Sequence, residues 1–223
     1  MAVRKGKLED VPEHAVICNY EDAIIHQWSV IKQWPKLSEV WPFKIGLPMV
    51  TTTAAWTGWK INSLIRRKLK LFSYGLGTTQ LAMALAPALF VGSCHLFFVT
   101  SDVFFESNQC LLCLQQKAAL IQGAFGIGYP LVMSPIANFM YATRHGTYNL
   151  PHWADYKGTL QLYFKLIKPM GPTILKMLVL QTFFTAFIVY QEKLSIEKMR
   201  VALENEEKLL EKEGVVIKQR IYD

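Results

Sequence analysis

Charged residues are scarce in this 223-residue chain and are missing altogether from two long stretches. Asp, Glu, Lys and Arg make up 18% of the sequence, against about a quarter in globular proteins. None occurs between Lys70 and Asp102, a gap of 31 residues, or between Lys117 and Arg144, a gap of 26 residues. Because roughly 20 apolar residues span a bilayer, these gaps predict a polytopic membrane protein rather than a disordered chain or a soluble enzyme.

Other absences exclude further classes of protein. Four cysteines are too few for a disulfide-dense secreted module. The net charge of +7 is not gathered into a basic stripe interleaved with aromatics, so we expect no nucleic-acid partner. Residues 1–18 lack the apolar core of a signal peptide, and their acids are atypical of a mitochondrial presequence. No Gly-rich phosphate loop or H-E-x-x-H motif occurs, so we expect neither catalysis nor a cofactor.

The apolar runs predict an all-α fold, a four-helix transmembrane bundle over residues 45–191. The expected spans are about 45–65, 74–98, 118–142 and 169–191. The first span carries Lys60 near one end, and a lysine there can reach the interface along its own stem. Only short loops remain between the spans, which leaves no room for a separate soluble domain.

The segments on either side of the spans are polar. Residues 1–44 form an N-terminal polar segment that contains a predicted amphipathic helix over 19–34. One face of this helix would carry Ile24, Trp28 and Ile31. The helix is expected either on the membrane surface or against partner protein. Residues 192–223 form a charged tail, predicted to be helical to near Gly214 and to be solvated or a short docking surface.

Small residues recur at four-residue spacing in the second and third spans. They are Ala84, Ala88, Gly92, Gly123, Ala124 and Gly128. Small residues let helix backbones approach closely where lipid supplies no hydrophobic drive. We predict that these faces pack on partner helices, although Gly and Ala are also common in membrane helices generally.

Charge inside the predicted spans is almost absent. Lys176 is the single charge within 169–191, and it is close enough to the interface for its ammonium to reach water. Ion pathways normally require intramembrane ionisable groups, so an ion carrier is disfavoured. We expect Asn62, Asn138 and Gln181 to hydrogen-bond between helices.

Two cysteines, Cys110 and Cys113, form a C-x-x-C just before the third span. Cys94 and His95 end the second span, so all four groups are expected at one membrane face. A metal site is disfavoured because adjacent residues on a helix point about 100° apart and cannot both ligate one ion. A disulfide between Cys110 and Cys113 in an oxidising compartment, a redox site, and inert thiols are the alternatives. In the next loop, His152 and Asp155 are expected to form turns.

The ordered set of segments resembles the transmembrane protein 126 family. NSLIRR closes the first span, the twin-cysteine loop follows, QGAFGIGYPLVMSP lies in the third span, and NLPHW precedes KPMGPTILKMLVLQTFFTAF. The resemblance covers roughly residues 60–190. It implies a cofactor-free protein of the mitochondrial inner membrane that helps to assemble respiratory complex I, by binding membrane-arm intermediates and other assembly factors. The alternatives are a stably bound accessory subunit of a respiratory complex and a small transporter or lipid-handling protein.

A basic cluster after the first span bears on membrane orientation. It consists of Arg66, Arg67, Lys68 and Lys70. Such residues fix topology and can contact cardiolipin or acidic partner loops. With four spans, loops 66–70 and 144–168 share one side, and both are rich in Lys and Arg. We therefore expect these loops in the matrix, and both termini with the cysteine loop in the intermembrane space.

Overall fold

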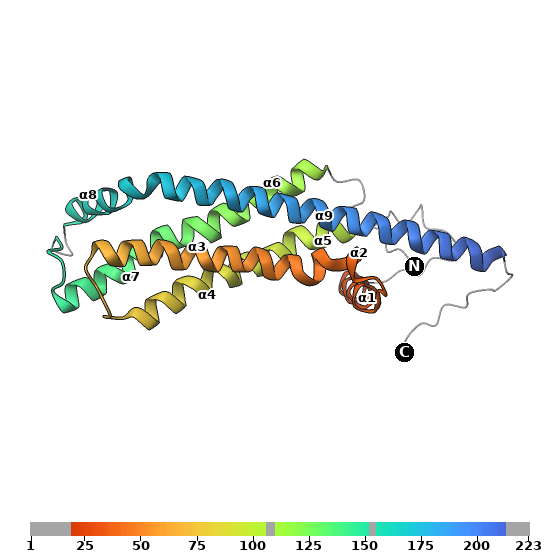
Figure 1. Cartoon of the computed structure of the whole chain (residues 1–223), viewed down its shortest axis with the longest axis horizontal. Coiled ribbons are helices and arrows are strands. Elements are labelled where there is room, and N and C mark those ends of the chain that lie inside the picture. Colours follow the sequence, from red (N-terminus) through yellow and green to blue (C-terminus); the bar gives the residue numbers. More distant parts are fainter. Residues whose placement is uncertain (1–18, 106–109, 152–154, 213–223) are drawn as a thin grey trace.

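A computed structural model describes residues 19–105, 110–151 and 155–212. Within these ranges the regular structure is entirely helical, which confirms the all-α prediction. Four long helical stretches run side by side along the molecule (Figure 1). We refer to them together as the bundle.

The first stretch follows α1 (Tyr20–Gln33), whose N–H at Tyr20 donates to the side chain of Asn19. Its elements are α2 (Leu37–Trp41), the π-helix η2 (Pro42–Gly46) and α3 (Leu47–Lys68). Trp34 is extended in front of Pro35, as the residue before a proline tends to be. This break turns α1 away from the stretch, so that it lies across one end of the bundle (Figure 1).

The second and third stretches each contain a π-helix between two α-helices. The second consists of α4 (Leu76–Cys94), η3 (His95–Thr100) and α5 (Ser101–Phe105). The third consists of α6 (Leu111–Ile121), η4 (Gln122–Gly128) and α7 (Tyr129–His145). Proline removes a backbone donor and crowds the preceding turn. A local widening accommodates this: η4 ends just before Pro130, and η2 of the first stretch begins at Pro42.

The fourth stretch starts earlier than the sequence predicts. Its elements are α8 (Tyr156–Ile167), the 3₁₀ turn η5 (Lys168–Met170) and α9 (Gly171–Lys212). The carboxylate of Asp155 accepts a hydrogen bond from the Gly158 N–H at 3.0 Å and so caps α8. The prediction that 144–168 is a loop is therefore wrong from residue 156 onward. His152 lies outside the described residues.

The helix α3 is central to the packing. It contacts α4 along most of its length and also touches α7, η4 and α9. Two apolar clusters hold the stretches together: one around Val50, Ala54 and Ile188 in the middle, and one around Ile61, Ile65 and Leu69 near the α3–α4 turn.

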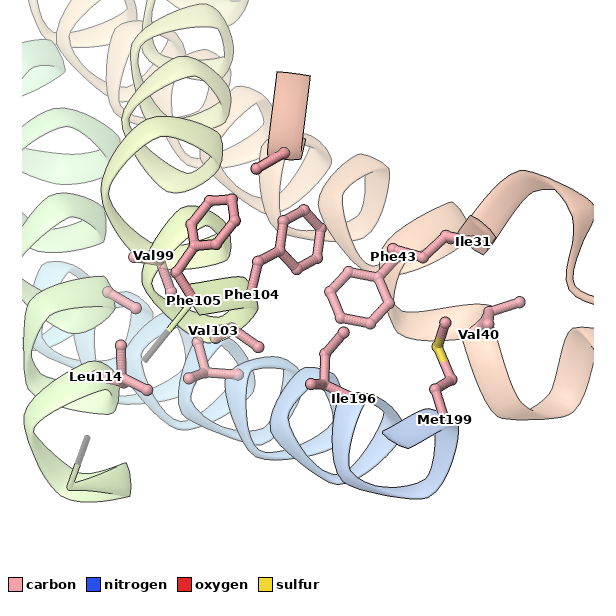
Figure 2. Packing of buried hydrophobic residues seen from close by; sticks show 13 residues of the cluster. Ile31, Val40, Phe43, Val99, Val103, Phe104, Phe105, Leu114, Ile196 and Met199 are labelled. Atoms are coloured by element: carbon pink, nitrogen blue, oxygen red, sulfur yellow. The ribbon is translucent and has the colours of Figure 1, made fainter. Parts of the chain in front are cut away.

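A third apolar cluster joins α1 to the opposite end of the bundle. Figure 2 shows Phe43, Phe104 and Ile196 meeting there from three different stretches. The indole of Trp28 packs edge-on against the rings of Phe104, with centroids 5.5 Å apart, and of Phe43, at 6.4 Å. One face of α1 is thus buried against its own chain, whereas Ile25 on another face is exposed.

Three helices of the described residues are long and apolar enough to cross a membrane. They are Leu76–Phe105, Leu111–His145 and Tyr156–Glu206. The chain is therefore a membrane protein with three candidate spans. The first predicted span, 45–65, lies almost wholly within the helix α3 but is not among them. The sequence of α3 includes several threonines, Lys60 and the first three residues of the basic cluster, Arg66, Arg67 and Lys68.

Candidate functional site

Arg66 is enclosed at the α3–α4 turn rather than facing lipid. Its side chain is 3% exposed. One guanidinium nitrogen, Nη2, donates to the carbonyls of Tyr74 at 2.7 Å and Phe72 at 3.0 Å. The other, Nη1, donates to the Thr79 hydroxyl at 2.8 Å and the Gly75 carbonyl at 3.2 Å. Both terminal nitrogens thus donate inside the chain and the residue is buried, so Arg66 is poorly placed for the lipid contact predicted for it.

The other members of the basic cluster take different positions. Arg67 and Lys70 are exposed. The ammonium of Lys68 donates to the Leu166 carbonyl at 2.6 Å, which ties the end of α3 to the end of α8. Arg67 and Lys70 therefore carry the accessible positive charge of this cluster.

Asn62 is a buried hydrogen-bond hub one turn from Arg66. Its carbonyl oxygen accepts from the Ser134 hydroxyl and from the Asn138 amide, both at 2.7 Å. Its own amide donates to the Gln80 carbonyl oxygen at 2.6 Å. Side chains from α3, α4 and α7 are thereby linked, as predicted for polar residues that join membrane helices.

Two buried glutamines join the middle of the bundle. The Gln181 amide donates to the Thr57 hydroxyl at 2.8 Å and the Thr53 carbonyl at 3.0 Å, and the Gln122 amide donates to the Thr53 hydroxyl at 3.0 Å. The carbonyl oxygens of both glutamine side chains, and the hydroxyl of Thr185, have no hydrogen-bond partner within the described ranges. Buried acceptors of this kind are normally satisfied by internal water.

A buried pair of ionisable side chains links η3 to α9. Nε2 of His95 lies 3.2 Å from Oε1 of Glu192, and both side chains are 1% exposed. The second oxygen of Glu192 has no partner in the part of the chain that the structure describes. The sequence placed Glu192 at the start of a solvated tail and His95 among candidate ligands, so this pair was missed. The sequence feature that could have indicated a buried Glu192 is its spacing from Gln181 and Thr185, which places three polar groups on one face of an apolar helix.

The two cysteines of the C-x-x-C begin α6 and are exposed free thiols. Cys94, at the end of α4, is half-buried, and its neighbour His95 turns inward to Glu192 instead. The ammonium of Lys117 pairs with the carboxylate of Asp102 at 2.5 Å, which joins α6 to α5. Whether Cys110 and Cys113 bridge remains a prediction.

The small residues divide between internal and outer positions. Gly92 is buried, and a Cβ added there would lie 2.8 Å from Cγ2 of Thr51 in α3, so this chain fills that space itself. Ala124 is exposed, whereas Ala84, Ala88, Gly123 and Gly128 are half-buried. One close helix approach was missed: a Cβ at Gly58 in α3 would overlap the carbonyl oxygen of Met83 in α4.

The outer surface of the bundle is apolar. Along α9, Leu175, Val179, Phe183 and Phe187 recur every four residues and are all exposed. Lys176 is also exposed on this helix. In the most apolar part of each candidate span, about a third of the residues or fewer are buried within the chain, so much of this surface is available to lipid or to other helices.

Comparison with known proteins bears on this arrangement of helices. The family model for Transmembrane protein 126 matches residues 24–206. The chain belongs to the transmembrane protein 126 family. A relative from Drosophila melanogaster, named Transmembrane protein 126, is 31% identical over 215 residues, which are 96% of each chain. No solved structure matches the chain.

The match to transmembrane protein 126 is longer than the resemblance read from the sequence, which covered roughly residues 60–190. It includes most of α1 and nearly all of α9. The matched residues include the buried pair of His95 and Glu192, near the α1 end of the bundle. They also include the α3–α4 turn around Arg66, at the opposite end. The family match therefore covers nearly the whole bundle, including both of its polar ends.

Proposed function

We propose that this transmembrane protein 126 family member is a multipass protein of the mitochondrial inner membrane that acts as a scaffold in assembly of the complex I membrane arm. Its partners would be membrane-arm subunits and other assembly factors, with the bilayer as its medium. The observation that carries the proposal is family membership over residues 24–206, together with the function that the resemblance implies. The protein would work by binding, without a cofactor or a catalytic step.

In this proposal α3 is a fourth membrane span. It has 22 residues and is therefore about 33 Å long, enough to cross a hydrocarbon core of about 30 Å. Its polar side chains Thr57, Asn62 and Arg66 are buried and hydrogen-bonded to neighbouring helices. These groups lower the mean hydropathy of α3, but because they are buried within the bundle they would not be exposed to lipid.

Binding through apolar and small-residue surfaces fits this chain. The polar side chains inside the bundle form hydrogen bonds mainly with each other. By contrast, α9 exposes the apolar side chains of Leu175, Val179, Phe183 and Phe187 on its outer face. Helices associate in lipid through close packing, for which exposed small and apolar residues serve. We place residues 66–70 and the segment 144–168, which includes α8, in the matrix and both termini in the intermembrane space, with Arg67 and Lys70 available to cardiolipin.

Complexome profiling of mitochondria tests the function. The protein is followed by mass spectrometry across a native gel, and a peak below mature complex I that is shared with membrane-arm subunits is expected. A peak coincident with the mature enzyme would instead make it an accessory subunit. Absence from both positions would refute any role in complex I.

A pair of variants tests the contact surface. Ala124→Leu enlarges an exposed small residue of η4 and is expected to reduce comigration with the assembly intermediates. Leu120→Met is the matched control, because Leu120 lies one turn earlier, is 73% exposed and is already large. Equal comigration of both variants, at equal membrane abundance, would rule out this face as the contact.

A further inference from the structure

The C-x-x-C occupies the first turn of a long helix at an exposed end of the bundle. Cys110 is the N-cap of α6, with an extended backbone at φ −59° and ψ 123°. The Cys113 N–H donates to the Cys110 carbonyl at 3.0 Å, which folds the second cysteine back over the first. Both thiols are exposed, whereas Cys94 is half-buried.

The surroundings of the two sulfurs differ. Polar groups of this first turn, the Cys113 backbone N–H foremost, then the Cys113 thiol and the Leu112 backbone, lower the pKa of the Cys110 thiol. The positive charge of Lys193 on α9 acts in the same direction. Helix N-termini and nearby cations are the settings in which reactive thiolates occur. Cys110 is thus the better nucleophile, and Cys113 stands within reach of it.

We infer that Cys110 and Cys113 form a thiol–disulfide exchange site, with Cys110 as the attacking thiol, Cys113 as the resolving thiol, and a glutathione-type disulfide as substrate. This activity is independent of the scaffold role proposed above. An inert structural bridge is disfavoured because both cysteines lie on one helical turn, so a disulfide between them would not link one helix to another.

The exchange balances in two steps. The Cys110 thiolate attacks one sulfur of the substrate disulfide; that S–S bond breaks, a mixed disulfide forms on Cys110, and the other half leaves as a thiolate that takes up a proton. Cys113 then loses its proton to solvent and attacks Cys110, which releases the second half. Two protein thiols are oxidised to one disulfide, and one substrate disulfide is reduced to two thiols.

The same geometry predicts which state is favoured. Groups that stabilise the Cys110 thiolate stabilise the reduced form relative to the disulfide, which makes the bridge easier to reduce. The degree of bridging should therefore follow the ratio of glutathione to glutathione disulfide, rather than remain fixed as in a structural disulfide.

The test uses the full chain in lipid nanodiscs with Cys18→Ser and Cys94→Ser, so that only the pair reacts. The reduced protein is exposed to glutathione disulfide, and its intact mass is followed. We expect the loss of two hydrogens in this protein, a trapped glutathione adduct in Cys113→Ser, and adduct formation at least tenfold slower in Cys110→Ser. Equal rates in the two single variants, or no bridge in the unmutated pair, would overturn the inference.

A second measurement separates a reactive thiol from a merely exposed one. The rate of iodoacetamide alkylation at Cys110 in Cys113→Ser, and at Cys113 in Cys110→Ser, is recorded against pH. The Cys110 profile should rise at lower pH, with its midpoint below the ordinary thiol value of 9.0, and should move upward in Lys193→Gln. Superimposable profiles for the two cysteines would contradict the assigned roles.

Discussion

The backbone of Gly58 in α3 lies directly against the carbonyl group of Met83 in α4. A Cβ at Gly58 would overlap the carbonyl oxygen of Met83 and would lie 3.1 Å from both the Met83 carbonyl carbon and Cγ of Pro87. The obstacle is mainly backbone, which cannot rotate aside as a side chain can. The crossing of α3 and α4, the most extensive helix contact described for this chain, therefore depends on glycine at this position.

The first prediction concerns this crossing. Gly58→Ala should force α3 and α4 apart and lower the free energy of unfolding by at least about 1–3 kcal/mol, the usual cost of overpacking. The control is Gly77→Ala in the first turn of α4, where a Cβ would meet no described atom within 4 Å, so the methyl group should be tolerated without loss of stability. Thermal unfolding in detergent compares the two, and equal midpoints would show that the crossing tolerates a methyl group.

The second prediction concerns the buried pair of His95 and Glu192. His95→Ala leaves the buried carboxyl group of Glu192 without its partner, and removing one member of a buried ionisable pair typically costs about 3–5 kcal/mol. Glu192→Gln keeps an acceptor for the imidazole and should cost about 1 kcal/mol. Chemical denaturation in micelles measures both, with the exposed Lys176→Ala as control. If His95→Ala unfolds at the same denaturant concentration as the control, the pair contributes nothing to stability.

The third prediction separates two neighbouring arginines of the basic cluster. Arg66→Met removes the donors that hold the carbonyls of Phe72, Tyr74 and Gly75, so the α3–α4 turn should open. Hydrogen–deuterium exchange across residues 69–76 is expected to quicken at least tenfold. Arg67→Met, an exposed neighbour, should leave this exchange unchanged. Similar exchange in the two variants would show that the carbonyls do not need Arg66.

The sequence was sufficient for the helical class, for three of the four predicted membrane spans and for the family. Two stretches without charge are too long for loops and too apolar for solvent, and they correspond to α4 and to the third helical stretch. The start of the fourth stretch was not predictable in this way, because residues 144–168 contain several charged, Gly and Pro residues that are typical of a loop. Helix α8 begins there because Asp155 caps it.

The buried charges were beyond the reach of the sequence for a different reason. Arg66 and Glu192 both lie at the end of a predicted span, where a charged side chain is ordinarily expected to reach water. Only the fold shows that the α3–α4 turn presents its carbonyls to Arg66, and that His95 from another helix reaches Glu192. In the same way, Gly58 is one small residue among many until α4 is placed against it.

The last prediction contrasts two buried amides that the sequence treated alike. Asn62 bonds to four side chains, so Asn62→Leu would leave the Ser134 O–H without its acceptor and the Gln80 carbonyl oxygen without its donor. It should cost at least about 2 kcal/mol, at about 1–3 kcal/mol for each such group. Gln181→Met should cost less than about 1 kcal/mol. It removes an acceptor that has no protein partner among the described residues, and the Thr57 hydroxyl keeps its bond to the Thr53 carbonyl at 3.0 Å. Urea unfolding of the two variants in one detergent gives the comparison, and a larger loss for Gln181→Met would mean that its side-chain oxygen is satisfied by ordered water.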